Sequence, residues 1–241
     1  MKTINWSGYE WITQERWGDI HPEKTYCWYD EHAVSIDVNS HLHLKTRYNP
    51  KWFKDKGLWS NTGVGLVSCT SKFKHGTFEI EAKLPNGLNL WPAFWMWSWD
   101  TWPPEIDVFE GYSDKNPNYL DLSNLLKIRK IESNVHYIGE DNKDKTLGAK
   151  KHWMGFKDPT KKFIKYKMTW LPESISIHYD NVLVRKIEDK NILKQLNATT
   201  LNVVINNHVT SKADSTYNWQ NFQSLAQESD FTIKQFTYTK L

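Results

Sequence analysis

The chain has few of the residues that would place it among membrane proteins or disulfide-scaffolded proteins. No run of 18 apolar residues occurs in its 241 residues, so the sequence offers no candidate transmembrane helix. Cysteine occurs twice, at Cys27 and Cys69, which is too few for a disulfide framework and has no metal-ligand spacing. The sequence alone leaves open whether these two thiols pair.

The chain also lacks the dense, arginine-containing basic clusters that nucleic-acid recognition usually needs. Lys+Arg number 31 against 28 Asp+Glu, which gives a net charge of +3, and arginine contributes little to the basic total. Proteins that read nucleic acids usually carry denser basic stripes and use arginine for bidentate contacts. We therefore expect no nucleic-acid partner. The opening residues, MKTINWSGYEW, lack the apolar core of a signal peptide.

Helical periodicity is nearly absent, and its best candidate is a short stretch over residues 191–196. Strand-like alternation dominates instead, in GTFEIEAKLPNG, FIKYKMTW, AVSIDV, HLHLKTR, VGLVSCTSKF, LNVVIN and FTIKQFTYT. SISIHY and VLVRKI flank Asp180-Asn181 and predict a hairpin, and the parity slip between Ile233 and Phe236 predicts a bulge. Without repeats or linkers, roughly a dozen short strands predict one all-β domain over residues 1–241, a sandwich of two antiparallel sheets.

Tryptophan is unusually abundant, with 14 residues in a chain whose aromatic content is 15%. Core packing rarely needs so many indoles, although many could be simple core and rim residues. A flat indole face stacks on the apolar C–H face of a sugar ring, so tryptophan-rich clefts are typical of glycan sites.

Carboxylates follow the tryptophans in LWPAFWMWSWDTWPPEIDVFEGY, residues 90–112. Glu105 and Asp107 share one face of a strand, whereas Glu110 returns to that face only if a bulge at Val108-Phe109 adds one residue. Solvation at a sheet edge is the plain explanation for three such acids. The functional explanation is glycoside hydrolysis by two carboxyl groups, which lie about 5–5.5 Å apart in retaining enzymes.

WPAFWMW followed by PPEIDVFEGY resembles the signature of glycoside hydrolase family 16. KFKHGTFEIEAKLPNG, SNVHY and KYKMTWLPESISIHYDNVLVRKI resemble further strands of that family, and the likeness runs from about residue 63 to the end. The extra residue before Glu110 is similar to the bulged subgroup of laminarinases, agarases, porphyranases and κ-carrageenases. The resemblance implies a jelly-roll, concanavalin A-like β-sandwich with a concave substrate cleft.

The resemblance also implies the roles of individual residues. Glu105 corresponds to the nucleophile, Asp107 to the assisting acid and Glu110 to the general acid/base. The candidates for substrate binding are Trp91, Trp95, His136, Arg47 and Asn206. Packing and sugar contact are equally open for Trp97, Trp99 and Trp102. For metals, a structural calcium is possible in the family, with Asp230 as the position to test, whereas His41 and His43 are interpreted as structural.

The predicted function is that of an endo-acting, retaining β-glycan hydrolase acting on β-1,3-glucan or an algal galactan. A non-catalytic lectin-like sandwich and a transglycosylase are the alternatives. The chemistry needs no cofactor, and we expect a polysaccharide substrate, no membrane span, a monomer and, from the resemblance, a secreted protein. Residues 52–61, 113–129 and 139–162 are expected to be loops that wall the cleft. Lys127, Arg129 and Lys130 are the candidate contacts to a sulfated galactan.

Overall fold

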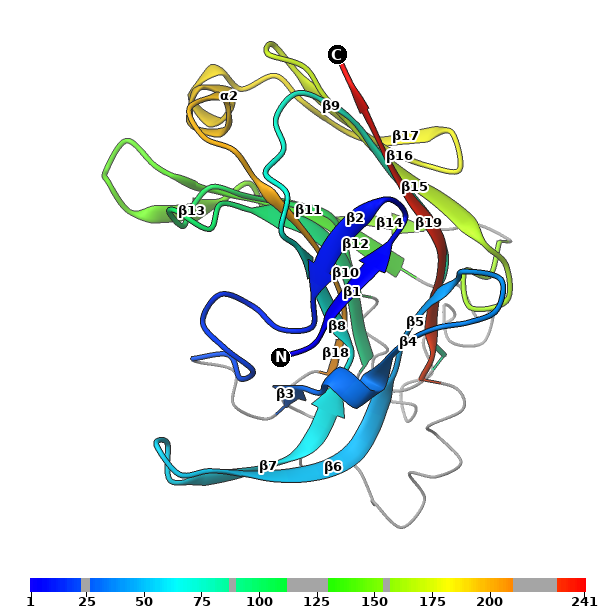
Figure 1. The fold of residues 1–241 in the computed structure, drawn as a ribbon. Coiled ribbons are helices and arrows are strands. Elements are labelled where there is room, and N and C mark those ends of the chain that lie inside the picture. The colour runs from blue at the N-terminus through cyan, green and yellow to red at the C-terminus, as the bar shows by residue number, and fades with distance from the viewer. Residues whose placement is uncertain (23–26, 87–89, 112–129, 154–156, 210–228) are drawn as a thin grey trace, which may run out of the picture.

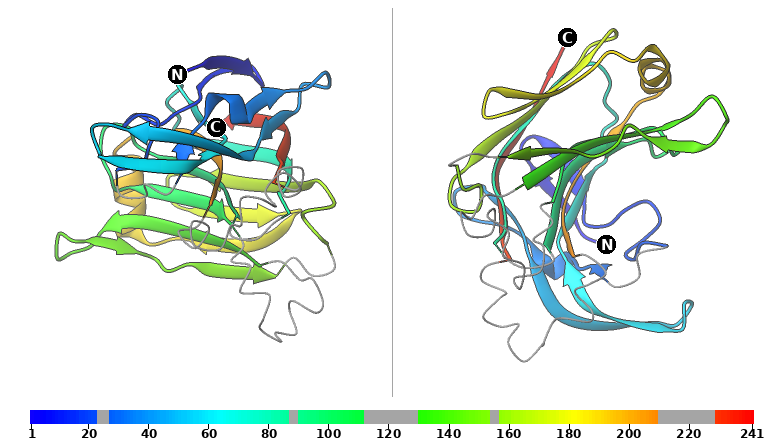
Figure 2. Two further views of the ribbon diagram at one scale, coloured as in Figure 1. Left: turned by 90° about the horizontal axis from the view of Figure 1, so that it is seen from below. Right: turned by 180° about the vertical axis from the view of Figure 1, so that it is seen from behind.

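The computed structural model describes residues 1–22, 27–86, 90–111, 130–153, 157–209 and 229–241. Within these ranges the chain is almost entirely extended, and two antiparallel sheets stack as layers (Figures 1 and 2). This arrangement confirms the predicted all-β sandwich. In the described part of the chain, no helix is long and apolar enough to cross a membrane.

The first sheet has nine strands in the described ranges and carries the acidic segment. Its order is β1 (Thr3–Trp6), β2 (Tyr9–Ile12), β8 (Leu66–Cys69), β18 (Asn202–Val209), β10 (Leu90–Trp97), β11 (Glu105–Glu110), β12 (Lys130–Ile138) and β13 (Asp144–Thr146). The ninth strand, β14 (Lys150–Trp153), pairs with β12.

The second sheet covers the opposite side of the core. Its order is β17 (Val182–Ile187), β16 (Ile175–Tyr179), β15 (Ile164–Trp170), β9 (Gly76–Lys83), β19 (Phe231–Lys240), β5 (Leu42–Leu44) and β4 (Val34–Ile36). A third sheet comprises β3 (Trp28–Tyr29), β7 (Leu58–Val64) and β6 (Thr46–Phe53), and the β6–β7 hairpin extends away from the two main layers (Figures 1 and 2). Within the described ranges the helices are η1 (Glu31–Ala33) and α2 (Lys190–Asn197).

The core lies between the two main sheets because each strand alternates apolar and polar side chains. Strand β9 buries Phe78, Ile80 and Ala82, as the alternation predicts. Across the core, the rings of Phe109 on β11 and Tyr166 on β15 lie 4.5 Å apart between centroids. Rings that interlock in this way fix the distance between the sheets and hence the position of β11.

Three local predictions are confirmed. The hairpin turn at Asp180 and Asn181 has φ angles of 49° and 70°, the left-handed conformation that a two-residue hairpin loop requires. The helix α2 begins after Asp189, whose carboxylate accepts hydrogen bonds from two backbone N–H groups. The last strand contains a register shift between Ile233 and Gln235.

Two of the predicted loops are loops only in part, because some of their residues form strands. Residues 52–61 belong to the paired strands β6 and β7 apart from the short turn between them, and residues 139–162 include β13 and β14. Short, weakly alternating strands of this kind leave little signal in the sequence. The third predicted loop, 113–129, lies outside the described residues. Cys27 and Cys69 are both buried and no disulfide joins them, which answers the question of pairing that the sequence left open.

Candidate active site

An extra residue in β11 turns the third carboxylate toward the other two. Phe109 pairs with Phe94 of β10, but Asp107 pairs with the next residue, Trp95, so Val108 has no counterpart on β10. The pairing of β11 with β12 also shifts between Asp107 and Glu110. This confirms the predicted bulge. Val108 and Phe109 are both buried, and Glu110 returns to the face of Glu105.

The second sheet holds the bulge from behind. The buried hydroxyl of Tyr179 on β16 donates a hydrogen bond of 2.8 Å to the backbone carbonyl of Val108. A bulge leaves a backbone group outside the regular ladder, and a buried carbonyl needs a donor. Tyr179 supplies that donor, while the Phe109 ring packs against Tyr166.

The three carboxylates line a cavity of about 610 Å³ on the first sheet. Its walls are mostly aromatic, and they come from β10, β11, the loop between these two strands, β12, β18, β3 and the segment after β2. The lining residues are Trp17, His21, Pro22, Tyr29, Trp91, Ala93, Trp95, Trp97, Trp102, Glu105, Asp107, Glu110, Asn134, His136, Asn206 and His208. An aromatic cavity with a few convergent polar groups has the composition of a ligand site.

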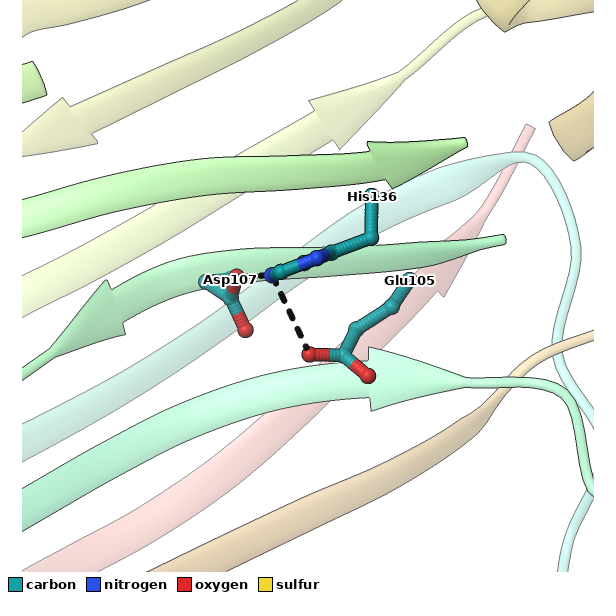
Figure 3. Close-up of side chains that lie close together, drawn as sticks. All are labelled: Glu105, Asp107 and His136. Carbon is teal, nitrogen blue, oxygen red and sulfur yellow. Dashed lines mark ion pairs between the residues drawn. The ribbon is translucent and has the colours of Figure 1, made fainter. Parts of the chain in front are cut away.

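Figure 3 shows Glu105 and Asp107 on β11, with the imidazole of His136 reaching toward both from β12. The Nε2 atom of His136 lies 3.8 Å from Oε1 of Glu105 and 3.5 Å from Oδ2 of Asp107. The indole Nε1 of Trp102 donates a 2.7 Å hydrogen bond to the other oxygen of Glu105. The predicted centre is therefore assembled, with Trp102 as an additional contact.

The environment favours the protonated form of Glu105. Burial, followed by the charge of Asp107, raises the pKa of Glu105 to about 8, although His136 and Trp102 act in the opposite direction. Two carboxylates so close together titrate as a pair that retains one proton after the first has left. The Glu105 carboxyl therefore keeps its proton to a higher pH than an ordinary glutamate does.

Asn134 holds His136 over this pair. Its amide nitrogen lies 3.3 Å from Nε2 of His136. Its amide oxygen accepts a 2.6 Å hydrogen bond from the hydroxyl of Thr146 on β13 and a 2.9 Å bond from the backbone N–H of Val135. These bonds fix the orientation of Asn134, and so the short strand β13 supports the site without lining it.

Four of the five predicted binding residues lie in the cavity wall, and one does not. The Asn206 side chain accepts a 2.7 Å hydrogen bond from the indole of Trp95 and donates to the carbonyl of Trp91. His136 completes the four. Arg47 is absent from the described residues that line the cavity, because its guanidinium lies against the buried Asp30 carboxylate, with an Nε–Oδ2 distance of 3.5 Å.

Sequence reasoning missed several wall residues. His208 lies two positions after Asn206 on the same strand, and its ring stacks on Tyr29 at 5.3 Å with an angle of 17° between the planes. Strand parity from Asn206 could have found His208, and parity from His136 could have found Asn134. Trp17, His21 and Pro22 come from an irregular segment that offers no such pattern.

Two places in the described part of the chain bring together groups that can bind a metal ion. Ligand atoms of Glu105, Asp107 and His136 all lie within 4.8 Å of one another, a spacing that a divalent cation could bridge. At the predicted calcium position, Nδ1 of His43 lies 2.8 Å from Oδ2 of Asp230. The other carboxylate oxygen, Oδ1, is buried and has no hydrogen-bond partner among the described residues. Calcium requires six to eight oxygen ligands, so a site at Asp230 stays a prediction.

An antiparallel sandwich that presents paired carboxylates among indoles is typical of glycoside hydrolases. The family model for glycosyl hydrolases family 16 matches residues 21–228, and the chain belongs to that family.

The comparisons with individual proteins agree with this assignment. The chain is 28% identical over 127 residues to endo-1,3-1,4-beta-glycanase EglC of Rhizobium meliloti (strain 1021), an alignment that spans 52% of this chain and 24% of that protein. It is similar in fold to the laminarinase catalytic domain of Thermotoga maritima MSB8, with a TM-score of 0.68 and 16% identity over 90% of this chain and 83% of that one. The chain is also similar in fold to a structure reported with endo-acting O-glycanases that members of the human gut microbiota express to initiate mucin breakdown. The TM-score is 0.70, with 19% identity over 95% of this chain and 84% of that one.

The bond that holds the bulge can be tested by Tyr179→Phe. Removing the hydroxyl leaves the buried Val108 carbonyl without this donor, so the free energy of unfolding should fall by about 1–3 kcal/mol in denaturant titrations. The matched control is Tyr238→Phe, which removes a 2.9 Å bond to the carbonyl of His75 on a half-buried ring, and its effect should be smaller. Wild-type stability of Tyr179→Phe would contradict this account of the bulge.

The contact of Trp102 with Glu105 predicts a change in titration. In Trp102→Phe the carboxylate loses a donor that favours its charged form, so the pKa of Glu105 should rise further above its ordinary value. A ¹³C NMR titration of the Glu105 carboxyl measures this directly. Trp59→Phe, at an exposed indole outside the cavity wall, is the control and should leave the titration unchanged. A downward shift in Trp102→Phe would refute the assigned contact.

Proposed function

We propose that this chain is an endo-acting, retaining β-glycan hydrolase. The observation that carries the proposal is that Glu105, Asp107 and Glu110 of one bulged strand line the same indole-walled cavity. A retaining glycosidase needs one carboxylate as nucleophile and one carboxyl group as acid, both reaching a single glycosidic bond. The chain spans about a quarter of the length of the curated relative EglC, so the activity is proposed for this chain alone.

In the proposed reaction, Glu105 attacks the anomeric carbon while Glu110 protonates the departing glycosidic oxygen. The C–O bond to the leaving sugar breaks as the ester between Glu105 and the sugar forms. Glu110, now a carboxylate, removes a proton from water, which attacks the same carbon and releases Glu105. Two inversions at one carbon give net retention of configuration.

Asp107 has a defined task in this scheme. The Glu105–Asp107 pair holds one proton, and Glu105 can attack only when that proton resides on Asp107. The nearby His136 lowers the pKa of Glu105, and the Trp102 indole does so through its hydrogen bond. Both therefore favour the charge distribution that attack requires.

The proposed substrate is a neutral β-1,3-glucan, with or without mixed 1,4-linkages. No lysine or arginine is found among the described residues that line the cavity, whereas a sulfated galactan would need cations against its charges. The names of EglC and the Thermotoga enzyme point to glucans of this kind. Lys127 and Arg129 lie outside the described residues and Lys130 begins β12, so their proposed role with sulfated chains remains a prediction.

Two alternatives use the same site. A lectin-like sandwich would bind glycan without cleaving it, but binding alone gives no reason to bury paired carboxylates. A transglycosylase would pass the sugar from Glu105 to an acceptor in place of water. Product lengthening in the presence of oligosaccharide acceptors distinguishes the latter. We further propose that residues 1–241 form one domain, that the protein is a monomer and that it acts outside the cell, where a polymeric glycan is encountered.

A substrate panel tests the proposed specificity. Purified protein is incubated with laminarin, mixed-linkage glucan, agarose, porphyran, carrageenans and mucin glycans, and new reducing ends are counted. We expect the highest kcat/KM on laminarin or mixed-linkage glucan, with internal cleavage and retained anomeric configuration by ¹H NMR. Highest activity on a sulfated galactan or on mucin glycans would contradict the proposed substrate, and inverted products would contradict the mechanism.

The separate roles of the two glutamates can be tested with two kinds of substrate. Glu105→Gln should lose at least about 10⁴-fold in kcat on both glucans and activated aryl glycosides, because the nucleophile is gone. Glu110→Gln should lose activity on glucans, yet still release the aryl group in a first burst, since a good leaving group needs no acid. Glu79→Gln, an acid on β9 of the other sheet that pairs with Lys165, is the control and should behave like wild type. Equal loss by the two cavity variants on the aryl substrate would show that the roles are misassigned.

A further inference from the structure

A fourth acidic residue, Glu132, lies opposite Glu110 on the neighbouring strand. The register of β11 and β12 pairs these two residues directly, beyond the bulge. Residues paired in this way share one face of the sheet, with Cβ atoms about 4.5–5.5 Å apart. Strand parity agrees, because Asn134 and His136, further along β12, line the same cavity as Glu110. Glu110 and Glu132 are therefore neighbouring acids on the cavity face of the first sheet.

An ion pair holds Glu132 on its other side. The register pairs Glu132 with Lys151 of β14, and Nζ of Lys151 lies 3.4 Å from Oε1 of Glu132. A carboxylate in such a pair carries its negative charge at neutral pH. Like charges directly opposite each other in a ladder are unfavourable. The fold therefore places a negative charge at the position where it disfavours a second one on Glu110.

No positive group faces Glu110 from the strand on its other side. There, on β10, the residue opposite Glu110 is Ala93, which carries no charge. The other titratable or charged groups among the described residues of the cavity and of the layer behind it are Glu105, Asp107, His136, His21, His208, Tyr179, Arg185 and His152.

The groups behind the strands leave the charge of Glu132 in place. Burial raises the pKa of Tyr179 well above its ordinary value, and burial lowers the pKa of His152 to about 4, so both are neutral near neutral pH. The buried guanidinium of Arg185 donates hydrogen bonds of 2.8 and 2.7 Å to the backbone carbonyls of Ser133 and Gly148. These groups are unchanged when Glu132 is substituted, so a substitution isolates the charge of Glu132.

We propose that Glu132 is a positioning residue whose negative charge holds the acid proton on Glu110. Because this charge disfavours the carboxylate form of Glu110, the proton that the leaving oxygen requires stays in place to a higher pH. Lys151 limits the effect, since its positive charge offsets part of that of Glu132. The consequence for the rate rests on the proposed function, whereas the consequence for the proton of Glu110 does not.

Two substitutions with opposite expected effects test the proposal. The kcat/KM of such an enzyme falls as the pH rises through the pKa of its general acid. In Glu132→Gln this alkaline limb should move to lower pH by about 0.5–1 unit, because a nearby negative charge is removed. In Lys151→Met it should move to higher pH by about 0.3 unit, because the charge of Glu132 is less offset. An unmoved limb in Glu132→Gln, or shifts in the same direction in both variants, would overturn the proposal.

The chain offers a matched control on the second sheet. Glu79 and Lys165 form an ion pair of 3.5 Å, and their side chains are 22% and 50% exposed, as are those of Glu132 and Lys151. Glu79→Gln should therefore leave the alkaline limb where it is in wild type. An equal shift in this control would overturn the assignment to Glu132.

A titration of the free protein separates this proposal from the proposed function. The ¹³C NMR signal of the Glu110 carboxyl should have a lower midpoint in Glu132→Gln than in wild type, and equal midpoints would overturn the proposal. If Glu132→Gln does not fold, the same titration of Lys151→Met decides, with a higher midpoint expected and an unchanged one contradicting the proposal. Absence of hydrolysis on every glycan would refute the proposed function alone, since the titration needs no substrate.

Discussion

The bulge at Val108-Phe109 is the constraint on which the rest of the site depends. Strand geometry alone would send Glu110 to the side opposite Glu105, into the core between the sheets. One extra residue reverses this, and the cost of a disrupted ladder is met from the other sheet by the hydroxyl of Tyr179. The stability of the sandwich and the placement of the carboxylates are therefore parts of the same packing arrangement.

Once the acids share a face, the distribution of charge between them becomes the second constraint. Burial and the charge of Asp107 raise the pKa of Glu105 to about 8, so its carboxyl favours the protonated form near neutral pH. His136 and Trp102 act in the opposite direction at Glu105. In the proposed mechanism this balance leaves the remaining proton on Asp107 when Glu105 attacks, a distribution of charge that depends on the surroundings and cannot be read from composition.

The sequence predicted the layers, the bulge and the acidic centre. The alternation of apolar and polar residues, the odd spacing between Asp107 and Glu110 and the acidic motif are all local properties of the sequence. Phe78 and Ile80 on β9 face the core as their parity requires. The sequence did not predict that Trp17 reaches the cavity from an irregular segment, or that the Arg47 guanidinium pairs with the buried carboxylate of Asp30. Those placements depend on contacts between distant segments, and a single sequence carries no local signal for them.

The most direct test of the account is to trap the covalent intermediate with a 2-deoxy-2-fluoro β-glucoside carrying a good leaving group. The account predicts one glycosyl adduct per chain, located by peptide mass spectrometry at Glu105, with Glu110 unmodified. Glu105→Gln should form no adduct under the same conditions. An adduct at Glu110 or Asp107, or turnover of natural glucan by a protein that never forms the ester, would contradict the claim that the bulged strand presents nucleophile and acid to one sugar.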